Sequence, residues 1–179
     1  MMEDLSLHLL DLAENAISAG ATRITVAVNE NERRDLLTLR VTDDGRGMTE
    51  EELARALDPF FTTKRKRTGL GLALLAQTAG CCGGDVTVES VAAKGTKVTA
   101  RLRYGHIDRP PLTKMAETMM MLVFGHPEID FRYSHRRNGR TFSFTSPAFF
   151  APPGPAWSPE RIGRVRRALR TGLKAIGAS

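Results

Sequence analysis

The chain has 179 residues, of which 41% are hydrophobic; this is enough to build a core and excludes a chain that is disordered throughout. No apolar run approaches the roughly 20 residues that span a bilayer, and the N-terminus lacks the order of a signal peptide, so we expect a soluble cytoplasmic protein. Residues 1–104 carry 14 basic and 15 acidic side chains, whereas residues 105–179 carry 12 and 5. The basic character belongs to the C-terminal part, so the net charge of +6 does not indicate what the first part binds.

The first predicted element is a helix that begins at Leu5 and is closed by Gly20. Apolar residues recur along it at helical spacing and form one continuous stripe: Leu5, Leu9, Leu12, Ala13, Ala16 and Ile17. Asp11 and Asn15 stand four positions apart and therefore share a face beside that stripe. Taken alone, these two side chains fit a solvated polar face as well as a functional one.

An antiparallel hairpin is predicted next, because apolar residues alternate with polar ones in two stretches between residues 23 and 43. The second stretch runs into the turn Asp43-Asp44-Gly45-Arg46-Gly47-Met48. Two glycines separated by one residue allow a tight turn and a close approach of the backbone to a ligand. A carboxylate just before such a turn can accept a hydrogen bond from a buried amine. The alternative is a plain turn between a strand and a helix.

A short helix is predicted next. Thr49 is its N-cap, three glutamates follow, and the helix should run to about Leu57. The basic run at 64–67 comes next and fits either a loop that contacts phosphate or a solvated loop. Gly69 and Gly71 then open an apolar helix. A glycine-rich turn that enters a helix presents free N–H groups and the positive end of the helix dipole, so it predicts an anion site with phosphate as the natural occupant.

A second antiparallel pair is predicted between Val86 and Leu102, with its turn near residues 94–96. The order helix, hairpin, helix, loop, helix, hairpin predicts an α/β two-layer sandwich, with helices on one face of a mostly antiparallel sheet. Cys81 and Cys82 are the only cysteines, and we interpret them as small buried residues in a reducing compartment.

Together these segments resemble the GHKL superfamily of ATP-binding domains, which comprises gyrase, heat-shock chaperones, histidine kinases and MutL-type mismatch-repair ATPases. The resemblance spans about residues 5–102, is closest to the ATP domain of histidine kinases, and implies a Bergerat-type mixed sheet. It implies ATP and Mg²⁺ as ligands, with Asn15 holding Mg²⁺ and Asp43 accepting from the adenine amino group. The other positions that match nucleotide-binding motifs of the family are Gly45, Gly47, Met48, Lys64, Gly69, Leu70, Gly71, Leu72 and Thr96.

Two positions depart from the family pattern. Arg67 occupies the first position of the glycine box, and Asp44 replaces the usual asparagine, which adds an anion near the site.

The position four before the metal-binding asparagine separates the subfamilies. Sensor histidine kinases usually have an amide there, whereas the hydrolysing members and the anti-sigma serine kinases have a carboxylate. This chain has Asp11, which is the candidate general base for water or a hydroxyl that attacks the γ-phosphate. Glu14 points elsewhere on the helix.

The resemblance leaves two hypotheses for the activity. The first is a stand-alone cytoplasmic ATPase or protein kinase; because few residues precede the first helix, we expect no complete sensor kinase, and we expect His8 to be a surface or core residue. The alternative is a nucleotide-dependent, anti-sigma-like regulator that binds a protein partner and turns over little ATP. A homodimer is compatible with both hypotheses.

The sequence divides into an ATP-binding domain at 1–104 and a basic extension at 105–179. After a linker, the extension is expected to contain a Met-rich helix from Leu112 to Phe124, a hairpin around Asn138-Gly139, a Pro-rich stretch and a final helix capped by Ser158.

The basic face of that final helix fits binding to nucleic acid, anionic lipid or an acidic partner, and it fits a solvated face equally well. The other histidines, His106, His126 and His135, show no metal-ligand spacing.

Overall fold

The computed structural model describes residues 4–57, 70–151 and 154–178. Its strands are β1 (Arg23–Asn31), β2 (Leu36–Asp43), β3 (Asp85–Val91), β4 (Gly95–Arg103), β5 (Asp130–Arg137) and β6 (Arg140–Thr145). Its helices are α1 (Leu5–Ser18), α2 (Glu50–Ala54), α3 (Leu70–Cys81), α4 (Met115–Gly125), α5 (Pro147–Phe150) and α6 (Pro159–Ile176), with a 3₁₀ turn η1 at Glu32–Arg34.

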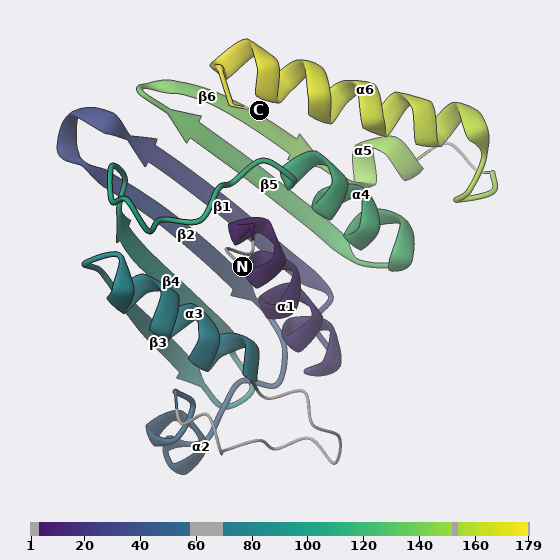
Figure 1. Ribbon diagram of the computed structural model, residues 1–179. Helices are drawn as coiled ribbons and strands as arrows, with labels where there is room; N and C mark the ends of the chain where they lie inside the picture. The colour runs from purple at the N-terminus through teal and green to yellow at the C-terminus, as the bar shows by residue number, and fades with distance from the viewer. Residues whose placement is uncertain (1–3, 58–69, 152–153, 179) are drawn as a thin grey trace.

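The strands form one sheet in the order β3-β4-β2-β1-β5-β6, and α1, α3, α4 and α6 lie together on one of its faces (Figure 1). Every neighbouring pair is antiparallel except β1 and β5, which run parallel. The predicted two-layer α/β sandwich with a mostly antiparallel mixed sheet is confirmed.

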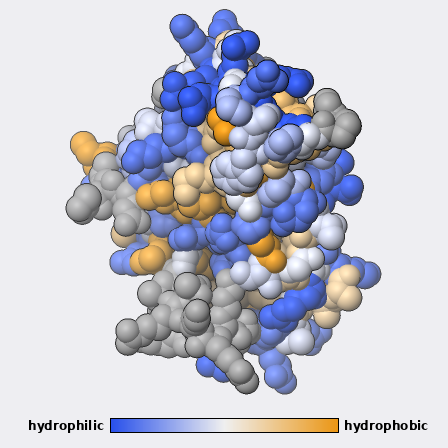
Figure 2. All heavy atoms as spheres, turned by 90° about the vertical axis from the view of Figure 1, so that its right-hand side faces the viewer, coloured by the Kyte–Doolittle hydropathy of each residue, from blue (hydrophilic) through white to orange (hydrophobic). Residues whose placement is uncertain are grey.

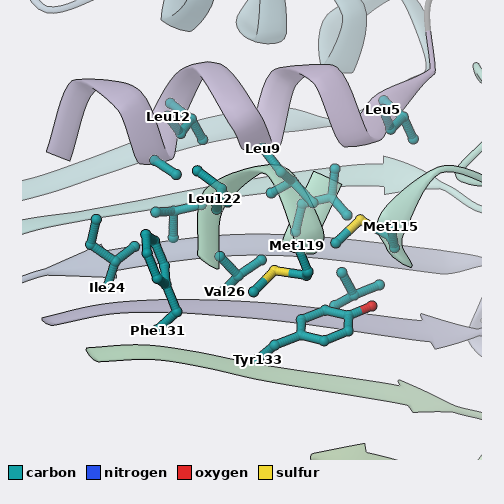
Figure 3. Close-up of a cluster of buried hydrophobic side chains, with 14 of the residues drawn as sticks. Leu5, Leu9, Leu12, Ile24, Val26, Met115, Met119, Leu122, Phe131 and Tyr133 are labelled. Carbon is teal, nitrogen blue, oxygen red and sulfur yellow. The ribbon is translucent and has the colours of Figure 1, made fainter. Parts of the chain in front are cut away.

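Helix α1 lies across the middle of the sheet, and its predicted apolar stripe faces the strands. Leu5 and Leu9 are fully buried and meet side chains from α4, β1 and β5 (Figure 3). Asp4 caps the helix, because its carboxylate accepts hydrogen bonds from the N–H of Ser6 and from the N–H and hydroxyl of Thr113. The helix that carries Asp11 and Asn15 is therefore fixed to both halves of the chain.

The C-terminal part of the chain extends the same sheet. The predicted hairpin forms around Asn138-Gly139, and its first strand, β5, pairs with β1 along the whole register from Arg23 opposite Asp130 to Glu30 opposite Arg137. Sequence analysis predicted the hairpin but not its partner strand. As a result β1 lies inside the sheet and the main hydrophobic core is continuous across residue 104.

Several predicted boundaries shift. Thr49 and Glu52 form the expected capping box, but α2 ends at Ala54, before Leu57. Helix α4 begins at Met115 rather than at Leu112, and α5 is a single turn within the Pro-rich stretch, where no helix was predicted.

The methionines of α4 divide between the core and the surface. Met115 and Met119 of α4 are fully buried in the core, whereas Met121 is 60% exposed. The cysteines at the end of α3 differ from the prediction, because Cys82 is buried but Cys81 is exposed.

Helix α6 begins as predicted, with the Ser158 hydroxyl accepting a hydrogen bond from the N–H of Arg161 and with Pro159 as its first residue. Its apolar side is buried, and its outer side carries the exposed cations Arg164, Arg166, Arg167, Arg170 and Lys174. The upper part of the molecule, where α6 and the end of the β5–β6 hairpin lie in Figure 1, is mostly hydrophilic in Figure 2. Within the described ranges, no helix has the length and apolar content that a membrane span requires.

Candidate functional site

The candidate site lies where β2 ends and β4 begins, next to the C-terminal end of α1. The turn after β2 packs closely on that helix: the N–H of Arg46 donates to the carbonyl oxygen of Ala19 at 2.9 Å. A Cβ at Gly45 would lie 3.0 Å from the same oxygen and 3.0 Å from the carboxylate of Asp43. A small residue at position 45 is therefore what lets the turn sit against the helix.

The other side of the turn packs against the β3–β4 connection. Gly47 has φ +64, and a Cβ there would overlap the carbonyl of Val91. Gly95 has φ +92, and a Cβ there would overlap the carbonyl of Asp43. Both positions thus need glycine for a left-handed conformation and for a close backbone approach, which explains the glycines after Asp43 and in the later turn.

Asp43 is half-buried, and its carboxylate accepts a hydrogen bond from the N–H of Gly45 at 2.9 Å. The backbone N–H of Thr96, its register partner on β4, also acts to lower the pKa of this carboxyl group. Burial raises the pKa of Asp43, and the nearby charge of Asp44 acts in the same direction. The carboxylate is therefore fixed in place, with oxygen lone pairs left for a donor from outside the protein.

Asp44 lies near the site, as predicted, but its carboxylate has a structural task. It accepts from the N–H of Thr22 at 2.8 Å, from the hydroxyl of Thr22 at 2.7 Å and from the N–H of Arg23 at 2.8 Å. Burial acts to raise its pKa, but these hydrogen bonds outweigh it and hold the pKa below the ordinary value. The expected extra anion is thus bound to the turn that joins α1 to β1.

Helices α1 and α3 meet beside this turn. A Cβ at Gly71, the second residue of α3, would lie 2.9 Å from the Cβ of Asp11 and 3.1 Å from its Oδ2. Asp11 is exposed and Asn15, one helical turn further, is half-buried. Leu72 is buried in the core and anchors this end of α3. The structure therefore brings the candidate base to the start of the glycine-flanked helix.

Part of the predicted phosphate-contacting set lies outside the described residues. Lys64 and Gly69 lie outside the described residues, as does Arg67 at the altered position of the glycine box. Leu70 is the first residue of α3. The role of this segment stays a prediction.

Sequence analysis missed Ser90 on β3. Its Oγ lies 2.9 Å from the N–H of Met48, 2.9 Å from the carbonyl oxygen of Gly95 and 2.9 Å from the hydroxyl of Thr96. Ser90 thus connects the turn that follows Asp43 to the start of β4. A signal was present in the sequence, because pairing the second hairpin about its turn places Ser90 opposite Thr96.

The histidines lie away from the Asp43 turn. His8 is buried on α1, and His135 is buried on β5. His126, at the end of α4, lies 3.9 Å from the carboxylate of Glu14 on α1. Over the part of the chain that the structure describes, no group of three or more His, Cys, Asp or Glu side chains could hold a metal ion. Mg²⁺ needs no such group, because it is commonly bound through one or two protein oxygens together with water and phosphate.

Comparison with known protein families shows the family to which this segment belongs. The family model described as "Histidine kinase-, DNA gyrase B-, and HSP90-like ATPase" matches residues 3–106. The chain belongs to this ATPase family. The matched span contains Asp11, Asn15, Asp43 and Thr96, and the predicted GHKL resemblance is confirmed.

Curated relatives of this ATPase family member include sensor histidine kinases. ZraS of Escherichia coli O157:H7 is 36% identical over 95 residues, which are 53% of this chain and 21% of ZraS. WalK of Bacillus subtilis (strain 168) is 31% identical over 111 residues, which are 57% of this chain and 18% of WalK. The chain therefore spans about one fifth of the length of these relatives.

A solved structure extends the likeness beyond the ATPase segment. The crystal structure of the N-terminal domain of a DNA repair protein superposes with a TM-score of 0.57 at 12% identity, and the match covers 98% of this chain and 57% of that one. At this identity the likeness shows the fold alone. It includes the C-terminal strands and helices as well as the family segment.

Proposed function

We propose that this ATPase family member binds Mg²⁺-ATP at the end of the sheet and acts on the γ-phosphate, as a small cytoplasmic ATPase or protein kinase. The observation that carries the proposal is the convergence of three segments. The turn after Asp43 packs on Ala19, the residue that caps the C-terminal end of α1, and the start of α3 packs on Asp11 of the same helix. Helix α1 therefore lies next to both the segment proposed to bind the base and the segment proposed to bind the phosphates.

The base end of the nucleotide belongs at the Asp43 turn. The carboxylate of Asp43, oriented by the N–H of Gly45, accepts a hydrogen bond from the adenine amino group. Gly45 and Gly47 let the backbone approach the ring, and Met48 lies beside it. Thr96 stands opposite Asp43 on the neighbouring strand and takes part in binding the same edge.

The phosphates belong at the start of α3. Leu70, Gly71 and Leu72 form the first turn of that helix, where backbone N–H groups have no partner within the helix and the dipole favours an anion. Lys64 and Gly69 complete the proposed set. The side-chain oxygen of Asn15 fits a metal ligand, since Mg²⁺ prefers oxygen; bound there, the ion would neutralise phosphate charge.

Asp11 is the proposed general base. Asp11 is an exposed residue one helical turn before Asn15, and its carboxylate lies against the first turn of α3. From that position it can accept a proton from water or from a hydroxyl that attacks the γ-phosphate. Glu14 lies on the side of α1 toward α4, near His126, and is not suited to the role.

A second candidate function is supported by the way the C-terminal part packs. Helix α4 contributes Met115, Met119 and Leu122 to the core beneath α1, and β5 pairs with β1 (Figure 3). Nucleotide binding at α1 could therefore be sensed by the C-terminal part, as a regulator that binds a protein partner would require. Such a regulator would bind ATP but release little phosphate.

Titration with a fluorescent ATP analogue, with and without Mg²⁺, tests the site. We expect Asp43→Ala to abolish binding and Asn15→Ala to abolish the Mg²⁺-dependent part. Glu14→Ala is the matched control on the same helix and should bind normally. If wild-type protein does not bind the analogue, the proposal is wrong, and binding of nucleic acid by the basic C-terminal part, with steep salt dependence, becomes the next function to test.

Measurement of phosphate release in the same samples distinguishes the two candidate functions, enzyme and regulator. Asp11→Asn should keep ATP affinity and lose turnover by a factor of about 10² or more if Asp11 is the general base. Unchanged turnover in Asp11→Asn would contradict that role. Absence of turnover in the wild type, with binding intact, would favour the regulator.

A further inference from the structure

The hydroxyl of Ser90 makes three contacts, and their chemistry fixes the direction of each hydrogen bond. The backbone N–H of Met48 can only donate, so Ser90 accepts from it at 2.9 Å. The carbonyl oxygen of Gly95 can only accept, so Ser90 donates its single proton to it at 2.9 Å. A serine hydroxyl has one proton and two lone pairs. The third contact, to the hydroxyl of Thr96 at 2.9 Å, is therefore accepted by Ser90 and donated by Thr96.

This assignment removes the freedom of the Thr96 hydroxyl to rotate. Its proton is directed toward Ser90 on β3, and only its lone pairs remain for anything on its other side. Thr96 is the register partner of Asp43, and its backbone N–H acts to lower the pKa of the Asp43 carboxyl group. Asp43 and Thr96 thus form a pair of acceptors, side by side on β2 and β4, with no donating hydroxyl between them.

We propose that Ser90 is a specificity-determining residue: by holding Thr96 as an acceptor, it makes the site select purine nucleotides with an amino group at position 6 over those with an oxo group. This inference rests on the proposed function, because it concerns the base that the site would bind. A 6-amino group donates to both acceptors. A 6-oxo group would place a third acceptor against them.

The selection also holds if a water molecule lies between the protein and the base. A water that donates one hydrogen to Asp43 and the other to Thr96 has only lone pairs left for the ligand. It therefore accepts from a 6-amino group and has nothing to donate to a 6-oxo group. Ser90 acts in both cases through Thr96, without touching the nucleotide.

The test compares the affinities of ATP and inosine triphosphate, which differ at position 6 and in the adjacent ring proton, by titration of the full chain. We expect wild-type protein to prefer ATP. In Ser90→Ala, the Thr96 proton is released toward the site, so the ratio of the two dissociation constants should fall by about tenfold, the usual effect of one hydrogen bond. Ser90→Thr keeps a hydroxyl and should keep the wild-type ratio.

A second variant tests the proposal even if Ser90→Ala unfolds the turn at Met48. Thr96→Val removes the acceptor but leaves the contacts of Ser90 with Met48 and Gly95, and it should lower the ratio by a similar factor. A wild-type ratio in Thr96→Val, or in a folded Ser90→Ala, overturns the inference. Failure of the wild type to bind either nucleotide would instead overturn the proposed function.

Discussion

At the scale of single residues, the site contains a carboxylate, that of Asp43, whose charged form lowers the stability of the fold. Burial raises the pKa of Asp43, so the folded state favours its protonated form. The contribution of this group to stability is therefore lost as the pH rises above the ordinary aspartate value of 3.8. A charge at position 43 therefore does not stabilise the fold, which agrees with the binding role proposed for Asp43.

The first prediction follows from this balance. Asp43→Asn should be at least as stable as the wild type at pH 7, and its advantage should shrink toward pH 4, while ATP binding weakens by about tenfold or more. Urea unfolding at several pH values and a nucleotide titration measure the two effects.

The neighbouring aspartate is the control. Asp44→Ala should lose stability at pH 7, because three hydrogen bonds stabilise that carboxylate and hold its pKa low. That loss should diminish below the ordinary value of 3.8. If the stability of the two variants changed with pH in the same way, the environments of Asp43 and Asp44 would not differ.

The second prediction concerns Gly47. Gly47→Ala places a Cβ against the carbonyl of Val91 and forces an L residue to adopt φ +64, so the free energy of unfolding should fall by about 3 kcal/mol or more. Gly80→Ala, within α3, meets nothing within 4 Å and should raise stability by up to about 1 kcal/mol. Thermal unfolding of the two variants provides the comparison, and a harmless Gly47→Ala would contradict the close packing of the turn.

The residues of the site differ in how far sequence predicts them. Asp43 and its glycines belong to one short segment with a local turn pattern, so they could be found without a structure. Ser90 makes three contacts with residues 5 to 42 positions away; the hairpin pairing predicts its position opposite Thr96, but nothing local predicts its contact with Met48. The structural role of Asp44 was missed for the same reason, because its partners lie 21 and 22 positions earlier in the chain.

At the scale of elements, α6 packs closely on β6 at Gly172. Gly172 faces the ring of Phe142 on β6, and a Cβ at that position would overlap the ring. Phe142 packs in turn against Tyr133, with ring centroids 6.1 Å apart. A larger residue at position 172 must therefore displace an aromatic ring or lift the helix.

The third prediction uses two glycines of the same helix. Gly172→Ala should lower the free energy of unfolding by about 1–3 kcal/mol, because the added methyl group overpacks the crossing. Gly163→Ala, with nothing within 4 Å, should gain up to about 1 kcal/mol from helix propensity. Chemical unfolding curves of both variants decide this, and a stabilised Gly172→Ala would mean that α6 does not pack on Phe142.

Elements whose signals are local were predicted well. The capping box at Thr49, the Asn138-Gly139 turn and the Ser158 cap each depend on residues within a few positions. The pairing of β5 with β1 depends on residues more than a hundred positions apart, and alternation along a strand does not name its neighbour.

At the scale of the whole molecule, a buried polar chain joins the two parts of the sheet. The hydroxyl of Tyr133 lies 2.6 Å from Nδ1 of His135, whose Nε2 lies 2.7 Å from the carboxylate of Glu30 on β1. Burial acts to raise the pKa of Glu30, but its hydrogen bond and attraction to His135 outweigh this and lower the pKa. Glu30 therefore adds stability above its ordinary value of 4.5, and that stability is lost as the pH falls.

The fourth prediction is that His135→Ala lowers the free energy of unfolding at pH 7 by about 3 kcal/mol, because it leaves Glu30 and the Tyr133 hydroxyl buried without their partner. The loss should become smaller below pH 4.5, where protonation removes the charge of Glu30. Arg136→Ala, an exposed neighbour on the same strand, should change little. A loss that does not vary with pH would exclude Glu30 as its cause.

The parallel pairing of β1 with β5 also sets an order of events during synthesis. Arg23 and Asp130, which are bonded across this pair, are 107 positions apart. While the ribosome is still making the residues between them, β1 is an edge strand with unpaired backbone groups, open to association with other nascent chains. The central strand gains its second neighbour only after β5 at residues 130–137 has been made, and contacts of such long sequence separation form slowly.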